Sequence, residues 1–150
     1  MVAIRVNPKS PTDFATEVSS ITPIPFDAGS SILSAGDLVQ EAAKRLEALL
    51  KEHPNGLIVV RGHRDQGDTQ ALLVQKATQD LNGLPLKRAQ VVRDYLVKFG
   101  LPTNRLGAFG AVPGIENAFP VEVCHEDTAE CHTRNRSVDF VSNGEAPTAK

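Results

Sequence analysis

The run Leu57-Ile58-Val59-Val60 is the feature that most restricts how this chain folds. It is short, rich in β-branched residues and free of alternating polar residues, as is typical of a central strand covered by helices. After Arg61, residues 62–68 read Gly-His-Arg-Asp-Gln-Gly-Asp. The sequence therefore predicts a buried strand that ends in a polar segment, which is either an ordinary turn or the rim of a binding site.

A helical pattern precedes this strand. Apolar residues recur at helical spacing from Leu38 to Leu50, and Pro54 closes the segment. Ser34 lies three residues before Asp37, as in a weak capping box. The pattern predicts an amphipathic helix packed on the strand.

A second helix is expected after the strand, over residues 85–99. One face carries Leu86, Ala89, Val92, Tyr95, Leu96 and Phe99. Gly100 stands at the usual position just past a helix end. The sequence of residues 69–79 predicts an extra short helix between the strand and this second helix.

Further strands are expected at residues 21–26, 105–110 and 136–142. The first contains two prolines, so it is expected at a sheet edge or at a bulge. Residues 2–6 alternate as a short strand does, and residues 143–150 are expected to be disordered. The order of elements predicts an α/β (α+β) two-layer sandwich in which helices pack on a mixed sheet.

Composition excludes several classes of protein. The chain has 150 residues, 41% of them hydrophobic, which fits one domain with one core. A net charge of −2 with mixed signs provides no general attraction for nucleic acid. No apolar stretch reaches the roughly 20 residues of a membrane span, and the first residues lack a signal-peptide layout. The chain is therefore either cytosolic or a soluble piece of a larger protein.

Charges at the start of the second helix suggest a receptor. Lys87 and Arg88 fall in its first turn, where the helix dipole disfavours cations by up to about 1 kcal/mol. Free N–H groups and a guanidinium together bind a carboxylate, and Asp65 leaves the strand toward the same region. Such a pair would hold an ammonium and a carboxylate together. A plain Asp–Arg salt bridge between loop and helix is the alternative.

Several spaced motifs resemble one known family. They are Phe-Asp-Ala-Gly-Ser at residues 26–30, Gly-His-Arg-Asp-Gln-Gly at 62–67, Leu-Pro-Leu-Lys-Arg-Ala at 84–89, Phe-Gly at 109–110 and Asn-Arg-Ser-Val-Asp at 135–139. Together they resemble the OmpA-like C-terminal domain of outer-membrane protein A, peptidoglycan-associated lipoprotein and MotB. The resemblance covers residues 21–142, with an insert at about 68–81 and an N-terminal extension over residues 1–20.

The resemblance implies a non-enzymatic periplasmic domain that binds peptidoglycan through meso-diaminopimelate and anchors an envelope protein to the cell wall. In the family, the position of Asp65 engages the ligand ammonium and that of Arg88 the carboxylate. Arg136 borders the pocket, and Asp27 lies near it. No cofactor or metal is implied.

This chain departs from the family at some positions. Arg64 replaces a threonine, Pro85 a serine and Leu81 an asparagine. The insert would lie over or beside the pocket. One alternative is therefore a diverged domain of the same fold that forms a homodimer or binds another protein, as in a stator or secretion component.

The stretch from Cys124 to His132 contains two cysteines and two histidines. A zinc site, or a small thiol- or metal-dependent hydrolase, is one interpretation, although the spacing matches no standard structural zinc pattern. The resemblance favours a disulfide between Cys124 and Cys131, because an exported domain meets oxidising conditions and some relatives bridge this loop.

Overall fold

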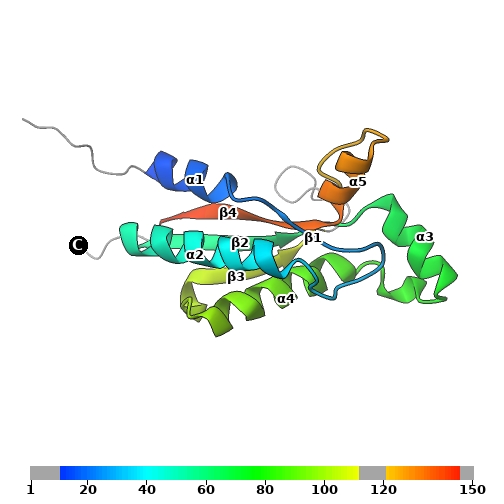
Figure 1. Ribbon diagram of the computed structural model, residues 1–150, viewed down its shortest axis with the longest axis horizontal. Coiled ribbons are helices and arrows are strands. Elements are labelled where there is room, and N and C mark those ends of the chain that lie inside the picture. Colours follow the sequence, from blue (N-terminus) through cyan, green and yellow to red (C-terminus); the bar gives the residue numbers. More distant parts are fainter. Residues whose placement is uncertain (1–10, 112–120, 146–150) are drawn as a thin grey trace, which may run out of the picture.

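The computed structural model describes residues 11–111 and 121–145. Its centre is a four-stranded mixed sheet with the order β1-β4-β2-β3 (Figure 1). β2 runs parallel to β3, whereas β4 runs antiparallel to both β2 and β1. The strands are β1 (Ile24–Pro25), β2 (Gly56–Gly62), β3 (Leu106–Gly110) and β4 (Ser137–Glu145). The predicted architecture of helices packed on a mixed sheet is confirmed.

β2 occupies an interior position of this sheet, as the apolar run at 57–60 predicts. Ile58 and Val60 are 1% and 0% exposed and belong to the main core. Val59 and Arg61 alternate with them and therefore face the other side of the sheet. Arg61 there contacts Asp139 of β4. One face of the sheet thus holds the core, and the other carries a polar pair.

The two predicted helices are present as α2 (Gly36–Glu52) and α4 (Leu84–Phe99). The N-cap of α2 is Ala35 and has no side-chain cap hydrogen bond, so the capping box predicted from Ser34 and Asp37 is wrong. Leu86, predicted on the core face of α4, is 38% exposed. It lies in the first turn, where backbone atoms of α4 approach the sheet in place of side chains.

A further helix, α1 (Pro11–Ser19), precedes the sheet and was not predicted. Phe14 and Val18 are completely buried and join the core beside β4. A proline in the first turn is compatible with a helix, because that N–H has no helical partner. The strand predicted at residues 2–6 lies outside the described residues. β1 is an edge strand, as its prolines predict.

The remaining helices are α3 (Gln66–Val74), α5 (Ala129–Asn135) and the 3₁₀ turns η1 (Thr78–Asp80) and η2 (Thr103–Arg105). α3 and α5 lie near the end of the sheet at which β2 finishes (Figure 1). β4 continues to Glu145, so the disordered tail predicted from residue 143 is wrong for residues 143–145, while 146–150 lie outside the described residues.

Two glycines allow α4 to lie directly against the strand ends. A Cβ at Gly62 would come within 1.8 Å of the Pro85 carbonyl oxygen, and one at Gly110 within 2.4 Å of the Leu86 nitrogen. These contacts fix the start of α4 over the ends of β2 and β3. Of the helices described, none has the length and apolar character needed to cross a membrane.

Candidate functional site

Asp65 begins the site, because β2 ends just before it and α3 starts just after it. Its side chain caps α3 by accepting a hydrogen bond from the Gly67 N–H at 2.9 Å. The side chain of Asp68 accepts in return from the Asp65 N–H at 2.8 Å, which completes a capping box. The Asp65 residue is only 3% exposed. A carboxylate is thus held rigidly at the end of the central strand.

α5 supplies two side chains to this carboxylate. Asn135 Nδ2 donates to Asp65 Oδ1 at 3.0 Å, and His132 Nδ1 lies 3.0 Å from both carboxylate oxygens. Asn135 is itself 2% exposed, and its Oδ1 accepts from the backbone N–H of Val123 at 2.7 Å. Neither His132 nor Asn135 was predicted as part of the site.

A disulfide between Cys124 and Cys131 holds α5 in place. The Thr128 side chain caps the helix by accepting from the Cys131 N–H at 3.1 Å. Because both sulfur atoms are bonded to each other, neither cysteine is available as a thiolate nucleophile or zinc ligand. The structure therefore contains the disulfide and argues against the thiol-dependent hydrolase.

His132 lies between two carboxylates. Its Nε2 is 2.8 Å from Asp127 Oδ1, on the side opposite Asp65. Hydrogen bonds to Asp127 and then Asp65 raise the pKa of His132 above its usual 6.5. Burial by itself would raise the pKa of Asp65, but hydrogen bonds from His132, Asn135 and the Gly67 N–H outweigh it and lower this pKa. At neutral pH Asp65 is therefore ionised.

Arg136 stands at the rim of a hollow that opens beside Asp65. Its Nη1 is 3.9 Å from Asp65 Oδ2, and its Nε donates to the Phe26 carbonyl at 3.1 Å. The hollow has a volume of about 410 Å³ and is lined by Asp65, Gln66, Gly67, Gln70, Ala129, His132, Thr133 and Arg136. Of the four predicted ligand-binding residues, Asp65 and Arg136 are brought together here.

Arg88 occupies a different position. It is 0% exposed and forms a bidentate ion pair with Asp68, with Nη2–Oδ1 at 2.7 Å and Nη1–Oδ2 at 2.9 Å. Its other N–H groups donate to the carbonyls of Ser30, His63 and Asp27. All five guanidinium N–H directions are therefore occupied by protein acceptors. Arg88 is not among the described residues that line the hollow, and its salt bridge is with Asp68 and not with Asp65.

Asp27 contributes its main-chain carbonyl to Arg88 at 3.0 Å, while the residue itself is exposed. Its carboxylate is not one of the groups that line the hollow around Asp65 among the described residues. Arg64 is half-buried and donates its backbone N–H to Val121. Sequence reasoning also missed Asp68, for which the Asp-x-x-Asp spacing at the start of α3 is a capping-box signal.

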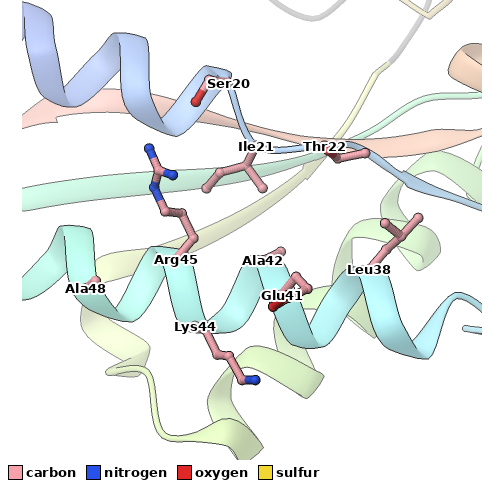
Figure 2. A pocket seen from close by; sticks show the side chains of 9 residues that line it. All are labelled: Ser20, Ile21, Thr22, Leu38, Glu41, Ala42, Lys44, Arg45 and Ala48. Atoms are coloured by element: carbon pink, nitrogen blue, oxygen red, sulfur yellow. The ribbon is translucent and has the colours of Figure 1, made fainter.

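A second hollow, of about 610 Å³, lies between α2 and the segment that follows α1 (Figure 2). It is lined by Ser20, Ile21, Thr22, Leu38, Glu41, Ala42, Lys44, Arg45 and Ala48. Arg45 is solvated, with a 52% exposed side chain. The hollow at Asp65 is smaller but contains a fixed, buried charge, and it is therefore the better candidate for a specific ligand.

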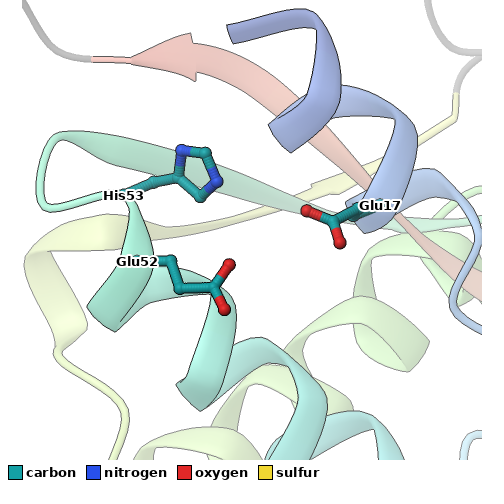
Figure 3. A group of neighbouring side chains, drawn as sticks. All are labelled: Glu17, Glu52 and His53. Carbon is teal, nitrogen blue, oxygen red and sulfur yellow. The ribbon is translucent and has the colours of Figure 1, made fainter. Parts of the chain in front are cut away.

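One cluster has side chains of the kind that ligate metals. Glu17, Glu52 and His53 converge where α1 meets the end of α2, with their ligand atoms within 4.8 Å of one another (Figure 3). Glu17 also pairs with Arg45 at 3.7 Å. Carboxylates and imidazole are acceptable ligands for zinc, yet acidic groups gather in this way on many protein surfaces. This geometry alone does not make a metal site.

Comparison with known proteins places this chain in a family. The chain matches the OmpA family model over residues 25–119. Proteins named peptidoglycan-associated lipoprotein from Brucella melitensis and Rhizobium meliloti are each 33% identical over 138 residues. The match covers 91% of this chain and 71% or 68% of the respective relative.

Solved structures share the fold. The C-terminal domain of Helicobacter pylori MotB is similar with a TM-score of 0.62 and 20% identity, over 84% of this chain and 87% of that one. The peptidoglycan-associated lipoprotein from Burkholderia pseudomallei is similar with a TM-score of 0.57 and 23% identity, over 89% of this chain and 100% of that one. The resemblance found in the sequence is confirmed, and the chain belongs to the OmpA family.

Proposed function

We propose that this chain binds peptidoglycan non-covalently through the hollow beside Asp65 and so attaches an envelope protein to the cell wall. The observation that carries the proposal is the Asp65 carboxylate, 3% exposed, with the Arg136 guanidinium 3.9 Å away at the rim of the hollow. A buried carboxylate attracts an ammonium, and a guanidinium attracts a carboxylate. Their proximity suits a ligand end that carries both charges.

The side-chain end of meso-diaminopimelate in a peptidoglycan stem peptide has this chemistry. We assign its ammonium to Asp65 and its carboxylate to Arg136. Arg88 supports the pocket indirectly, because it fixes Asp68 and hence the N-cap that orients Asp65. Direct contact of Arg88 with a ligand would require it to leave Asp68. The relatives named peptidoglycan-associated lipoprotein support this class of ligand.

The same relatives support a place in the cell envelope, and we propose the periplasm. The disulfide between Cys124 and Cys131 agrees with this proposal, because disulfides persist in oxidising compartments and are rare in the cytosol. We infer a binding role and not a catalytic one, because the described residues around the hollow offer a ligand a buried carboxylate and a guanidinium.

Co-sedimentation with purified sacculi tests the proposal. Sacculi that contain meso-diaminopimelate are compared with sacculi that contain lysine, whose side chain ends in an ammonium without the carboxylate. The variants are Asp65→Asn, which keeps an effective N-cap without the charge, and Arg136→Ala. Arg134→Ala is the matched control, because Arg134 is an exposed arginine two residues earlier.

We expect the protein to pellet with diaminopimelate sacculi and weakly with lysine sacculi. A lost hydrogen bond to a charged group corresponds to about 1.5–3 kcal/mol, so each site variant should bind about tenfold or more weakly. Arg134→Ala should bind as the wild type does. Equal retention of all variants, or no pelleting of the wild type, would contradict the proposal and favour a protein-interaction or dimerisation module.

A further inference from the structure

We propose that His132 is the gate of this pocket: its imidazole occupies the place on Asp65 that a ligand ammonium needs, and the ligand must displace it. The inference rests on the proposed function and adds a gate to it. It explains why Asp65 is covered even though it lies at the wall of an open hollow.

Both oxygens of Asp65 already have donors, and the residue is only 3% exposed. A carboxylate offers about four lone-pair sites, two on each oxygen. Oδ1 accepts from Asn135 and lies 3.0 Å from His132 Nδ1, while Oδ2 accepts from the Gly67 N–H and lies at the same distance from that nitrogen. A new ammonium therefore has to replace one of these donors.

His132 is the donor that can be replaced. The Gly67 N–H belongs to the first turn of α3, and Asn135 is 2% exposed and tied to the backbone of Val123 and Cys124. The His132 side chain, in contrast, is 25% exposed and lines the hollow. Its removal uncovers Asp65 without disturbing the other two hydrogen bonds.

The surroundings of His132 show that it acts as a cation. Both ring nitrogens face carboxylates, Asp65 at the start of α3 and Asp127 in the loop before α5. An ionised carboxylate only accepts hydrogen bonds, so both nitrogens must carry protons to satisfy the two contacts. Arg136 of the segment before β4 is the other charge at Asp65, at 3.9 Å. The gate is thus an internal imidazolium that mimics the ligand.

This arrangement makes ligand binding depend on pH. Its contacts with Asp127 and Asp65 raise the pKa of His132, so the imidazolium persists above pH 6.5. Below the raised pKa of His132, its imidazolium competes with the ligand ammonium for Asp65. Above that pKa the ring is neutral and competes less. Affinity should therefore increase with pH. Displacement between the usual and the raised pKa should release a proton, because the freed imidazole returns to its ordinary pKa.

Calorimetry on the full chain tests the gate, with the stem tetrapeptide L-Ala-γ-D-Glu-meso-diaminopimelate-D-Ala as the probe. Titrations at about pH 6 and about pH 8 bracket the ordinary imidazole range, and one at about pH 7 lies just above the usual pKa, where proton release is expected. Two buffers of different ionisation enthalpy measure the proton release. His132→Gln removes the charge, and Asp127→Asn removes one partner of the imidazolium at a residue whose side chain is 96% exposed. His125→Gln is the control, because His125 is in the same loop with an 82% exposed side chain.

The wild type should bind about tenfold more tightly at about pH 8 than at about pH 6, and its binding at about pH 7 should release protons. His132→Gln should bind tightly at both pH values without proton release, Asp127→Asn should shift the transition to lower pH, and His125→Gln should follow the wild type. Equal affinity and equal pH dependence in His132→Gln and the wild type would overturn the gate while the proposed function stands. Weaker binding by His132→Gln at both pH values would make His132 a ligand contact and also overturn the gate.

The charge state of His132 can also be measured in the absence of a ligand. Titration of the His132 imidazole by NMR in the free protein should give a pKa above the usual value, and Asp127→Asn should lower it. An ordinary pKa for His132 in the free wild type would overturn the gate whatever the calorimetry shows. No binding by either the wild type or His132→Gln, with a raised imidazole pKa, would instead count against the proposed function, and the gate as stated would fall with it.

Discussion

Arg88 and Asp68 form a bidentate ion pair in which both side chains are 0% exposed. The pair connects the first turn of α3 to the first turns of α4. Asp68 also accepts from the backbone N–H groups of Gly29 at 2.6 Å and Asp65 at 2.8 Å. One carboxylate therefore joins the loop after β1, the N-cap of α3 and α4, and it determines where Asp65 is held.

Asp68→Ala should destabilise the fold strongly. Removing one partner of a buried ion pair leaves an uncompensated charge, which costs about 3–5 kcal/mol. The measurement is the free energy of unfolding in urea. Asp94→Ala, at an exposed position of α4, is the control and should change it by less than about 0.5 kcal/mol. A loss in Asp68→Ala no larger than in the control would show that the buried pair does not hold the loop and helices together.

The fold should lose stability in acid because of the lowered pKa of Asp139. Burial acts to raise its pKa, but hydrogen bonds from Arg61 and then His63 lower it from 3.8 to about 2. The contribution of about 2 kcal/mol is present above pH 3.8 and is lost as the pH falls through about 2. The unfolding free energy of Asp139→Asn should therefore depend less on pH in this window than that of the wild type. Parallel profiles would contradict the assignment.

The disulfide should stabilise both the fold and the pocket. Bonding Cys124 to Cys131 closes a loop with a sequence separation of 7, which corresponds to roughly 2–3 kcal/mol in the chain-entropy model. Double replacement with serine should lower the melting temperature. A reducing agent should lower the melting temperature of the wild type by the same amount and leave that of the variant unchanged. If the melting temperature of the wild type is unchanged after the disulfide has been reduced, this prediction is wrong.

Gly62→Ala tests the close approach of α4 to β2. The added Cβ would lie 1.8 Å from the Pro85 carbonyl oxygen, so α4 must move, and overpacking of this kind costs about 1–3 kcal/mol. Gly36→Ala is the matched control, because no atom lies within 4 Å of its added Cβ. Chemical denaturation should show destabilisation only for Gly62→Ala. Wild-type stability in that variant would mean that α4 does not rest on the strand end.

Sequence periodicity predicted β2, α2 and α4 well, because each buries a regular face against the others. It missed α1, whose buried Phe14 and Val18 span only one helical turn, too short a repeat to stand out. It also missed α5, a helix of 7 residues that is fixed by a disulfide and a cap. In both cases tertiary contacts, and not local periodicity, determine the structure.

Only part of the geometry of the candidate site could be predicted from the sequence. Asp65 follows from its place at the end of β2, but spacing alone does not give side-chain direction at a helix start. As the N-cap, Asp65 turns back onto the N–H of Gly67, and Asp68 takes the position facing Arg88. His132 comes from a distant segment, so its contact with Asp65 was not visible in a single sequence.

Mapping of amide shifts by NMR during titration with the diaminopimelate tetrapeptide, at about pH 8, shows whether a ligand binds in the hollow beside Asp65. We expect saturable shifts at Asp65, Gly67 and Arg136, much weaker shifts with the lysine tetrapeptide and loss of the shifts in Asp65→Asn. Shifts confined to residues away from this hollow, or the same shifts in Asp65→Asn, would contradict the proposed function.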